Sequence, residues 1–306
     1  MLLYKIIDDN LKEIKEIPFK KERELHKLCE ANLERIYGLK YVCSEFSINN
    51  FRIDTLAYDQ KNKTFIIIEY KKDKNFSVID QGYAYLSLLL NNKADFILEY
   101  NECCRDTLKR KDIDWSQSKV MFVSTSFTAY QRESINFKDL PMELWEVKRF
   151  DNKTIFFNQI KPAGVKESIN TVSRDNNDIE KVNKEIKVYT EEDHVLNVPE
   201  YMVDLYQTFK EAILNLGDNI ELNPTKLYIG FVVNKKDITD IHILKSSLKI
   251  WINLKLGELD DPKGIARDVS NVGHWGNGDF EIKISNDDDL EYVLSLIKQS
   301  YKKNTM

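Results

Sequence analysis

The segment that most constrains the fold is Thr64–Lys71, a run of β-branched and aromatic residues. Its composition and its period of two predict a strand. The same period places Glu69 and Lys71 on the face that carries Ile67. A carboxylate and an ammonium on an otherwise apolar face are unfavourable to bury unless each has a partner. Glu69 and Lys71 are therefore candidates for a chemical site.

The segments around this strand predict a helix, three strands, a second helix and a further strand. Apolar residues at helical spacing predict a helix over 20–37, and Gly38 is placed to end it. Strands follow at 41–48 and 51–58, joined by an Asn-Asn turn. The elements expected downstream are a helix over 77–92 capped by Ser77, strands at 95–100 and 119–124, a helix at about 128–135, and a hairpin of 144–150 with 154–160.

Length and composition favour a soluble, two-domain protein. The chain has 306 residues, of which 42% are hydrophobic, enough for a sizeable core in each of two domains. No apolar run approaches the roughly 20 residues of a membrane-spanning helix. The N-terminal residues lack the layout of a signal peptide, so we expect a cytoplasmic protein with no membrane partner.

The distribution of apolar residues predicts a domain over 1–160, a polar linker over 161–192 and an α+β domain over 193–306. In the last part a helix is expected over 199–216, with Gly217 ending it. The other elements expected there are strands at 226–233, 241–244, 248–254 and 280–285, and a final helix capped by Ser285 or Asn286.

The cysteines and histidines show no local metal-binding pattern. There is no CxxC motif, and the histidines are scattered singly. We therefore expect reduced structural thiols, and oxygen ligands for any metal. The residues concerned are Cys29, Cys43, Cys103, Cys104, His26, His194, His242 and His274.

Residues 20–100 resemble the PD-(D/E)XK nuclease superfamily, in its RecB-like branch. Asp54, in Arg52-Ile53-Asp54, takes the place of the motif aspartate, although the preceding proline is absent. Glu69-Tyr70-Lys71 matches the E-x-K motif, and the segment from Gln81 to Tyr85 resembles QxxxY. The resemblance implies an α/β fold with a restriction-endonuclease-like mixed sheet flanked by helices.

The resemblance also implies a role for each motif residue. Asp54 and Glu69 offer hard oxygen ligands suited to Mg²⁺ or Mn²⁺. Lys71 is expected to orient the attacking water or to offset developing charge. Gln81 and Tyr85 lie four residues apart, so they project from one helix face, where they can hold the phosphate backbone or nearby water.

Members of this superfamily usually take another metal-binding carboxylate from the helix before the sheet. At 100° per residue, Glu22 points closest to the apolar face of the 20–37 helix. We expect Glu22 to complete the site, with Glu30 as the alternative.

The last part of the chain resembles a functionally obscure domain family found at the C-terminus of predicted bacterial nucleases and restriction-like proteins. Its signature is Asp268-Val269-Ser270 followed by the glycine-flanked loop 273–279. His274 and Trp275 in that loop can stack on a base. The alternative is that Trp275 fills the core of its own domain.

These observations predict a Mg²⁺-dependent nuclease that hydrolyses DNA. A place in restriction or phage defence follows only from the resemblance. The competing hypothesis is a protein that binds nucleic acid or a partner and whose nuclease fold is catalytically idle. RNA as substrate and a homodimeric state stay open.

Overall fold

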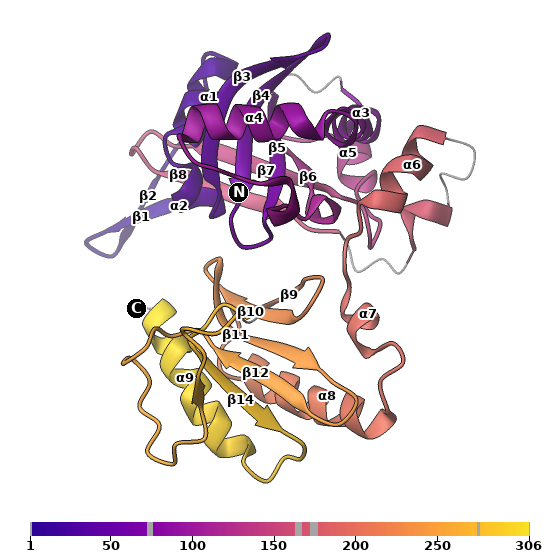
Figure 1. Ribbon diagram of the computed structural model, residues 1–306. Coiled ribbons are helices and arrows are strands. Elements are labelled where there is room, and N and C mark those ends of the chain that lie inside the picture. Colours follow the sequence, from indigo (N-terminus) through magenta and orange to yellow (C-terminus); the bar gives the residue numbers. More distant parts are fainter. Residues whose placement is uncertain (1, 72–75, 163–166, 172–176, 274–275, 306) are drawn as a thin grey trace. The chain divides into compact units, whose positions relative to one another are not determined.

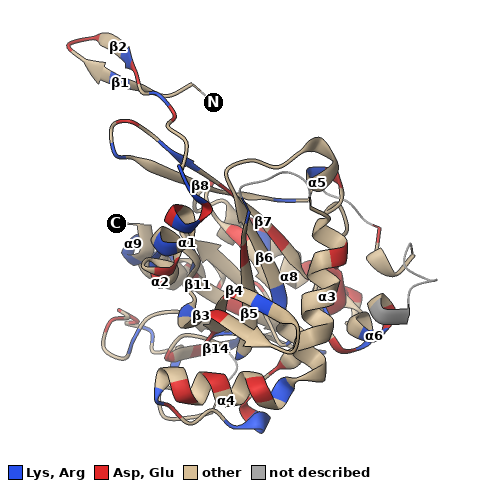
Figure 2. Cartoon of the chain, turned by 90° about the horizontal axis from the view of Figure 1, so that it is seen from above, with Lys and Arg blue, Asp and Glu red and all other residues tan. Residues whose placement is uncertain are grey.

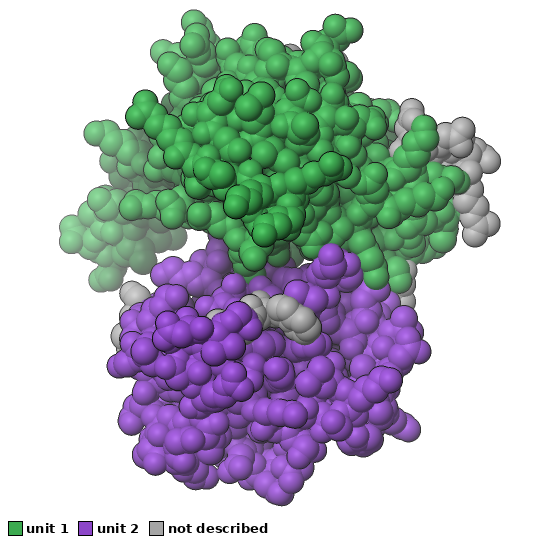
Figure 3. Space-filling model, in the orientation of Figure 1, with its two compact units in different colours: residues 1–188 green, residues 189–306 purple. Residues whose placement is uncertain are grey.

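The computed structural model describes residues 2–71, 76–162, 167–171, 177–273 and 276–305. The chain divides into two compact units, Met1–Val188 and Tyr189–Met306 (Figure 3). The pair His274-Trp275, for which two roles were predicted, lies outside the described residues.

In the described part of unit 1, a six-stranded mixed sheet has the order β3-β4-β5-β6-β7-β8 (Figure 1). Strands β3, β4 and β5 pair antiparallel to one another. Strands β5, β6 and β7 run parallel, and β8 pairs antiparallel to β7. This sheet confirms the predicted fold class. The strands are β3 (Lys40–Ile48), β4 (Phe51–Asp59), β5 (Thr64–Lys71), β6 (Lys119–Ser124), β7 (Met142–Arg149) and β8 (Ile155–Ile160).

Helices bury both faces of the strand β5. On one face, α3 (Val78–Asn91) and α4 (Lys93–Cys104) pack in a cluster that contains Phe65 and Ile67. On the other face, α1 (Glu22–Glu30) and α2 (Leu33–Tyr37) cover a second cluster. The continuous apolar run of β5 matches this environment, because a strand covered on both faces needs apolar side chains on both.

The ends of the helices follow capping chemistry. The hydroxyl of Ser77 accepts a hydrogen bond from Asp80 N at the start of α3. Gly38 ends α2 in the left-handed region, with φ 69°. The single helix predicted over 20–37 is instead divided between α1 and α2 near Asn32, whose side-chain amide donates to Leu28 O.

The strand predicted at 95–100 is wrong, because this segment lies within α4. Phe96 and Tyr100 are four residues apart, and both are buried on the side of α4 that meets the sheet. Both rings contact Phe65 of β5. The helical spacing of these aromatic residues outweighs the β propensity of the segment.

The predicted linker over 161–192 also needs correction. The short 3-10 helix η3 (Ile169–Thr171) and α6 (Asn177–Glu185) belong to unit 1. Val182 joins the apolar cluster that α3 covers, and Tyr83 Oη of α3 donates to Asn183 Oδ1 at 3.0 Å. The boundary between the units therefore lies after Val188, and the polar sequence before it includes a packed helix.

Unit 1 contains further short elements besides these strands and helices. The hairpin of β1 and β2 projects from the rest of the unit (Figure 2), and its strand residues are exposed. These elements are β1 (Tyr4–Ile7), β2 (Asn10–Glu13), η1 (Arg110–Asp112), η2 (Trp115–Gln117) and α5 (Ala129–Glu133).

Unit 2 is an α+β domain. Its described residues include a six-stranded antiparallel sheet in the order β13-β14-β12-β11-β10-β9. An apolar cluster joins this sheet to α8 (Glu200–Leu214) and α9 (Leu290–Thr305). The other elements are α7 (Glu191–Val195), β9 (Glu221–Pro224), β10 (Ile229–Val233), β11 (Lys236–Ile243), β12 (Leu248–Ile252), β13 (Arg267–Asp268) and β14 (Phe280–Ile284). Across the described residues of both units, every helix is too short or too polar to cross a bilayer.

Candidate functional site

Asp54 and Glu69 meet where β4 and β5 separate. The backbone pairing of the two strands ends at Thr55 and Ile68. Beyond this point Asp54 N donates to Glu69 Oε1 at 3.2 Å, and Tyr70 N donates to Asp54 Oδ2 at 3.0 Å. The two carboxylates thus take over hydrogen bonds that strand carbonyls accept elsewhere in the sheet. This exchange fixes the side chains of Asp54 and Glu69.

The two carboxylates lie side by side, each bonded to the backbone of the other strand. Glu69 Oε1 lies 3.2 Å from Asp54 N. Standard bond lengths keep a backbone nitrogen within about 4.5 Å of the nearer oxygen of its own aspartate. The nearer carboxylate oxygens of Asp54 and Glu69 are therefore at most about 8 Å apart. Two oxygen ligands of one metal at about 2.1 Å each lie within about 4.2 Å of one another, so a shared cation would draw the two carboxylates to this separation.

Negative charge is in surplus at this site. Glu69 is buried, with 2% of its surface exposed, and its burial raises the pKa of the carboxyl group. The charge of Asp54 raises this pKa further, whereas Lys71 acts in the opposite direction. Lys71 Nζ donates to Glu69 Oε2 at 3.1 Å. Among the residues that the structure describes, the ammonium of Lys71 thus accompanies two carboxylates, and an additional cation would lower the electrostatic free energy of the site.

Gln81 and Tyr85 of α3 lie beside the same carboxylates. Tyr85 Oη donates to Arg52 O at 3.3 Å. Burial raises the pKa of Tyr85, and the charge of Glu69 raises it further. Gln81 Oε1 is buried and has no hydrogen-bond partner among the described residues. An unpaired buried amide oxygen is uncommon, and here it leaves an acceptor beside the carboxylates.

The geometry favours Glu30 over Glu22 as the further carboxylate. Thr55 Oγ1, next in the chain to Asp54, donates to Glu30 Oε1 at 2.6 Å. Glu22 is exposed at the first residue of α1. Eight residues separate the two glutamates, which is about 12 Å along a helix. The helical phase ranked Glu22 first because phase alone does not show which end of α1 approaches β4.

His26 lies at this site, although its place in the sequence did not predict it as a site residue. Its Nε2 lies 2.8 Å from Glu30 Oε1 and 3.1 Å from Thr55 Oγ1, and its ring stacks on Tyr70 with the centroids 4.5 Å apart. Burial tends to lower the pKa of His26, but Glu30 and Asp54 outweigh this effect and raise it. The signal that was available is the i,i+4 spacing of His26 and Glu30 on one helix.

The residues at this site fit a hard divalent cation. Asp54 and Glu69 provide carboxylate oxygens, and the carbonyl oxygen of Gln81 has no other partner among the described residues. Mg²⁺ and Mn²⁺ prefer oxygen ligands and keep several waters.

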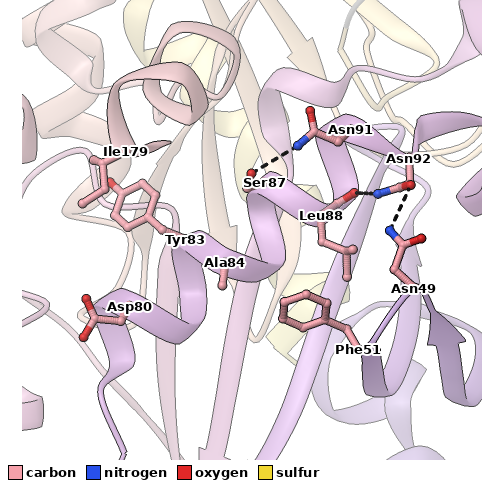
Figure 4. A pocket seen from close by; sticks show the side chains of 10 residues that line it. All are labelled: Asn49, Phe51, Asp80, Tyr83, Ala84, Ser87, Leu88, Asn91, Asn92 and Ile179. Carbon is pink, nitrogen blue, oxygen red and sulfur yellow. Dashed lines mark hydrogen bonds between the residues drawn. The ribbon is translucent and has the colours of Figure 1, made fainter. Parts of the chain in front are cut away.

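A cavity of about 480 Å³ lies on another face of α3, against the β3–β4 hairpin (Figure 4). Its amides are hydrogen-bonded within the lining: Asn49 donates to Asn92 Oδ1, and Asn91 donates to Ser87 Oγ. Asp80 is its one carboxylate within the described residues. This cavity offers binding contacts and lacks the group of charged residues seen at Asp54.

The chain is 52% identical over 294 residues to an uncharacterized protein of Haemophilus influenzae, and the match covers 95% of this chain and 96% of the relative. The chain belongs to the same family as this Haemophilus influenzae protein. In the present chain, residues 191–304 match the model of a domain of unknown function, DUF5655. That domain coincides with unit 2 and confirms the expectation of an obscure C-terminal domain.

Two solved structures resemble parts of the present chain. An EndoMS–dsDNA2 complex is 18% identical with a TM-score of 0.25, covering 38% of this chain and 40% of that chain. A repair endonuclease from Pyrococcus abyssi is 17% identical with a TM-score of 0.22, covering 40% of this chain and 45% of that chain. This chain thus matches less than half the length of either protein.

Proposed function

We propose that this protein is a Mg²⁺- or Mn²⁺-dependent nuclease that hydrolyses phosphodiester bonds in DNA. One observation carries the proposal: Asp54, Glu69 and Lys71 converge where β4 and β5 separate, and their charges do not balance. A buried carboxylate facing a second carboxylate is unfavourable in a purely structural role. The same arrangement suits a cation that carries a phosphate.

The side chains divide the chemistry among them. Asp54 and Glu69 would hold the divalent cation, which would supply Lewis acidity toward the phosphate and make the attacking water more acidic. Lys71, fixed by its bond to Glu69 Oε2, places an ammonium where it can orient the attacking water and offset charge on the phosphate. Gln81 Oε1 can accept a hydrogen bond from a water molecule.

Glu30 and His26 position the aspartate in this proposal. Glu30 accepts a hydrogen bond from Thr55, which follows Asp54 directly, and His26 holds Glu30 in place. Hydrogen-bond partners around metal-binding carboxylates fix their orientation, and their loss typically lowers metal affinity or activity by about 10–100-fold.

DNA is the proposed substrate, with restriction or phage defence as the proposed context. Both follow from the motif resemblance at Asp54, Glu69, Lys71, Gln81 and Tyr85. The charge arrangement supports phosphodiester chemistry on either nucleic acid, since DNA and RNA share the phosphate.

The test is a cleavage assay with the full chain. Supercoiled plasmid, linear duplex, single-stranded DNA and RNA are each incubated with Mg²⁺, with Mn²⁺ or with EDTA. We expect cleavage of DNA with either metal, none with EDTA, and none by Asp54→Asn. The exposed carboxylate variant Glu45→Gln, on the neighbouring strand β3, is the matched control and retains activity.

Each contrary outcome has a defined meaning. Cleavage of RNA alone rejects the proposed substrate but keeps the chemistry. Binding of DNA or a metal without cleavage under every condition supports the idle-fold alternative. Equal cleavage by Asp54→Asn and the parent protein rejects the proposed site.

A further inference from the structure

Two cysteines and a glutamate come together where α4 meets the edge strand β3. Cys43 lies on β3, and Glu99 and Cys103 lie one turn apart on α4. The two Sγ atoms and a carboxylate oxygen all lie within 4.8 Å of one another. Cys103 Sγ donates to Glu99 Oε1 at 3.2 Å, and both cysteines are free thiols.

This spacing is close to that of ligands around a tetrahedral metal. Zn–S bonds of about 2.3 Å place two sulfur ligands about 3.8 Å apart at the tetrahedral angle. Shortening the distances between the ligand atoms of Cys43, Glu99 and Cys103 by about 1 Å or less would give that geometry. Cys43 is buried, whereas Cys103 is exposed. A metal here would have three protein ligands on one side and room for water on the other.

The electrostatics at this position favour a cation. Burial raises the pKa of the Cys43 and Cys103 thiols, and the charge of Glu99 raises both further. Cys103 lies in the last turn of α4, where the helix dipole is negative. Lys40 donates instead to Tyr100 Oη and Asp106. Glu99 has no ion pair with Lys or Arg within the described part of the chain.

We propose that Cys43, Glu99 and Cys103 form a binding site for a thiophilic divalent cation such as Zn²⁺. Sulfur ligands distinguish this site from the all-oxygen group at Asp54 and Glu69, because soft thiolates select zinc and hard oxygens select magnesium. Binding releases the thiol protons and leaves the sulfur atoms as thiolates.

The site has a structural consequence for unit 1. A metal bound by Cys43 and Cys103 ties α4 to the edge of the sheet and closes a loop that contains β4, β5 and α3. Asp54, Glu69 and Tyr85 all lie in that loop. The metal is therefore expected to stabilise the part of the chain that carries the candidate active site.

Cobalt titration of the reduced full-length protein tests this site. Co²⁺ in a thiolate site absorbs in the near ultraviolet, and Zn²⁺ removes this band by displacing the cobalt. We expect one equivalent of Co²⁺ per chain. The band should be lost in Cys103→Ser, and Glu99→Gln should bind at least tenfold more weakly. Cys104→Ser is the matched control and keeps the band, because its Sγ donates instead to Tyr41 O.

Several results would overturn the inference. One is the absence of a cobalt band in the reduced parent protein. Another is a band that persists in Cys103→Ser or disappears in Cys104→Ser. A Cys43–Cys103 disulfide that resists reductant would also exclude the site. Circular dichroism of each variant separates loss of ligand from loss of fold, and Cys103→Ser changes an exposed residue.

Discussion

Two lysine–glutamate pairs lie near opposite ends of the central strands of unit 1. Lys119 of β6 sits beside Ile66, near the start of β5, and pairs with Glu143 of β7. Lys71 ends β5 and pairs with Glu69. In the first pair Glu143 stabilises the charge of Lys119, with a smaller contribution from Asp59, and Trp145 Nε1 donates to Glu143 Oε2 at 2.9 Å. The second pair faces the additional carboxylate Asp54.

This difference separates a structural ion pair from a candidate chemical site. Burial tends to lower the pKa of Lys119, but Glu143 outweighs this effect and raises it, so the charged pair is mutually stabilised. At Glu69 the pKa is raised as well, which disfavours the charged form of a carboxylate. An ion pair alone therefore indicates little about function, whereas a buried carboxylate whose pKa is raised by a second carboxylate is typical of a functional site.

The largest expected contrast is in activity. Glu69→Gln should lower the rate of DNA cleavage by about 10²–10³-fold, because it removes a charged metal ligand. Glu143→Gln changes the same residue type in the same sheet and should leave the rate per folded molecule within a few-fold. The measurement is the initial rate with saturating Mg²⁺. Similar losses in both variants would remove the distinction between the two pairs.

The next contrast concerns the two glutamates of α1. Glu30→Gln should lower the cleavage rate by about 10–100-fold, because Thr55 and His26 both bond to Glu30. Glu22→Gln should retain the parental rate, because Glu22 is exposed at the start of the helix. If Glu22→Gln instead lowered the cleavage rate more than Glu30→Gln, Glu22 would be the further carboxylate of the site, as the helical phase predicted.

How far the sequence predicts the site depends on the range of each contact. The alternation in β5 and the E-x-K spacing are local, and they correctly predicted a strand over Thr64–Lys71. The choice between Glu22 and Glu30 requires knowing which end of α1 approaches β4. Helical phase does not contain this information.

The errors in the fold have a similar origin. The segment 95–100 has strong β propensity, yet packing of Phe96 and Tyr100 against Phe65 makes it helical. The polar sequence of α6 resembles a linker until Val182 is seen in the apolar cluster. Cys43 and Cys103 come together only through the packing of α4 on β3, so a search for CxxC spacing misses them.

A third contrast is in stability without metal. Glu143→Gln should lower the free energy of unfolding by about 1–3 kcal/mol, because it leaves the partly buried Lys119 without its partner. Glu69→Gln should leave stability unchanged or raise it by up to about 1 kcal/mol, because it relieves repulsion with Asp54. Urea denaturation in EDTA measures both. Equal destabilisation by the two substitutions would show that the carboxylate at Glu69 is structural.

The smallest expected effect is a pH dependence. The folded pKa of Glu69 lies above its unfolded value of about 4.3. Its stabilising contribution is therefore fully present below about pH 4.3 and is lost as the pH rises through the folded pKa. In EDTA the stability of the parent protein should fall relative to Glu69→Gln over this window. If the difference in unfolding free energy between the parent and Glu69→Gln does not change with pH, the pKa of Glu69 is not raised in the folded protein.

The most direct test of the central claim exchanges each lysine for an uncharged residue of similar length. Lys71→Met and Lys119→Met are compared with the parent in Mg²⁺-dependent cleavage of duplex DNA, corrected for the folded fraction. We predict a loss of at least about 10²-fold for Lys71→Met and a change within a few-fold for Lys119→Met. Equal rates for the two variants, or full activity in Lys71→Met, would contradict a catalytic site at the separation of β4 and β5.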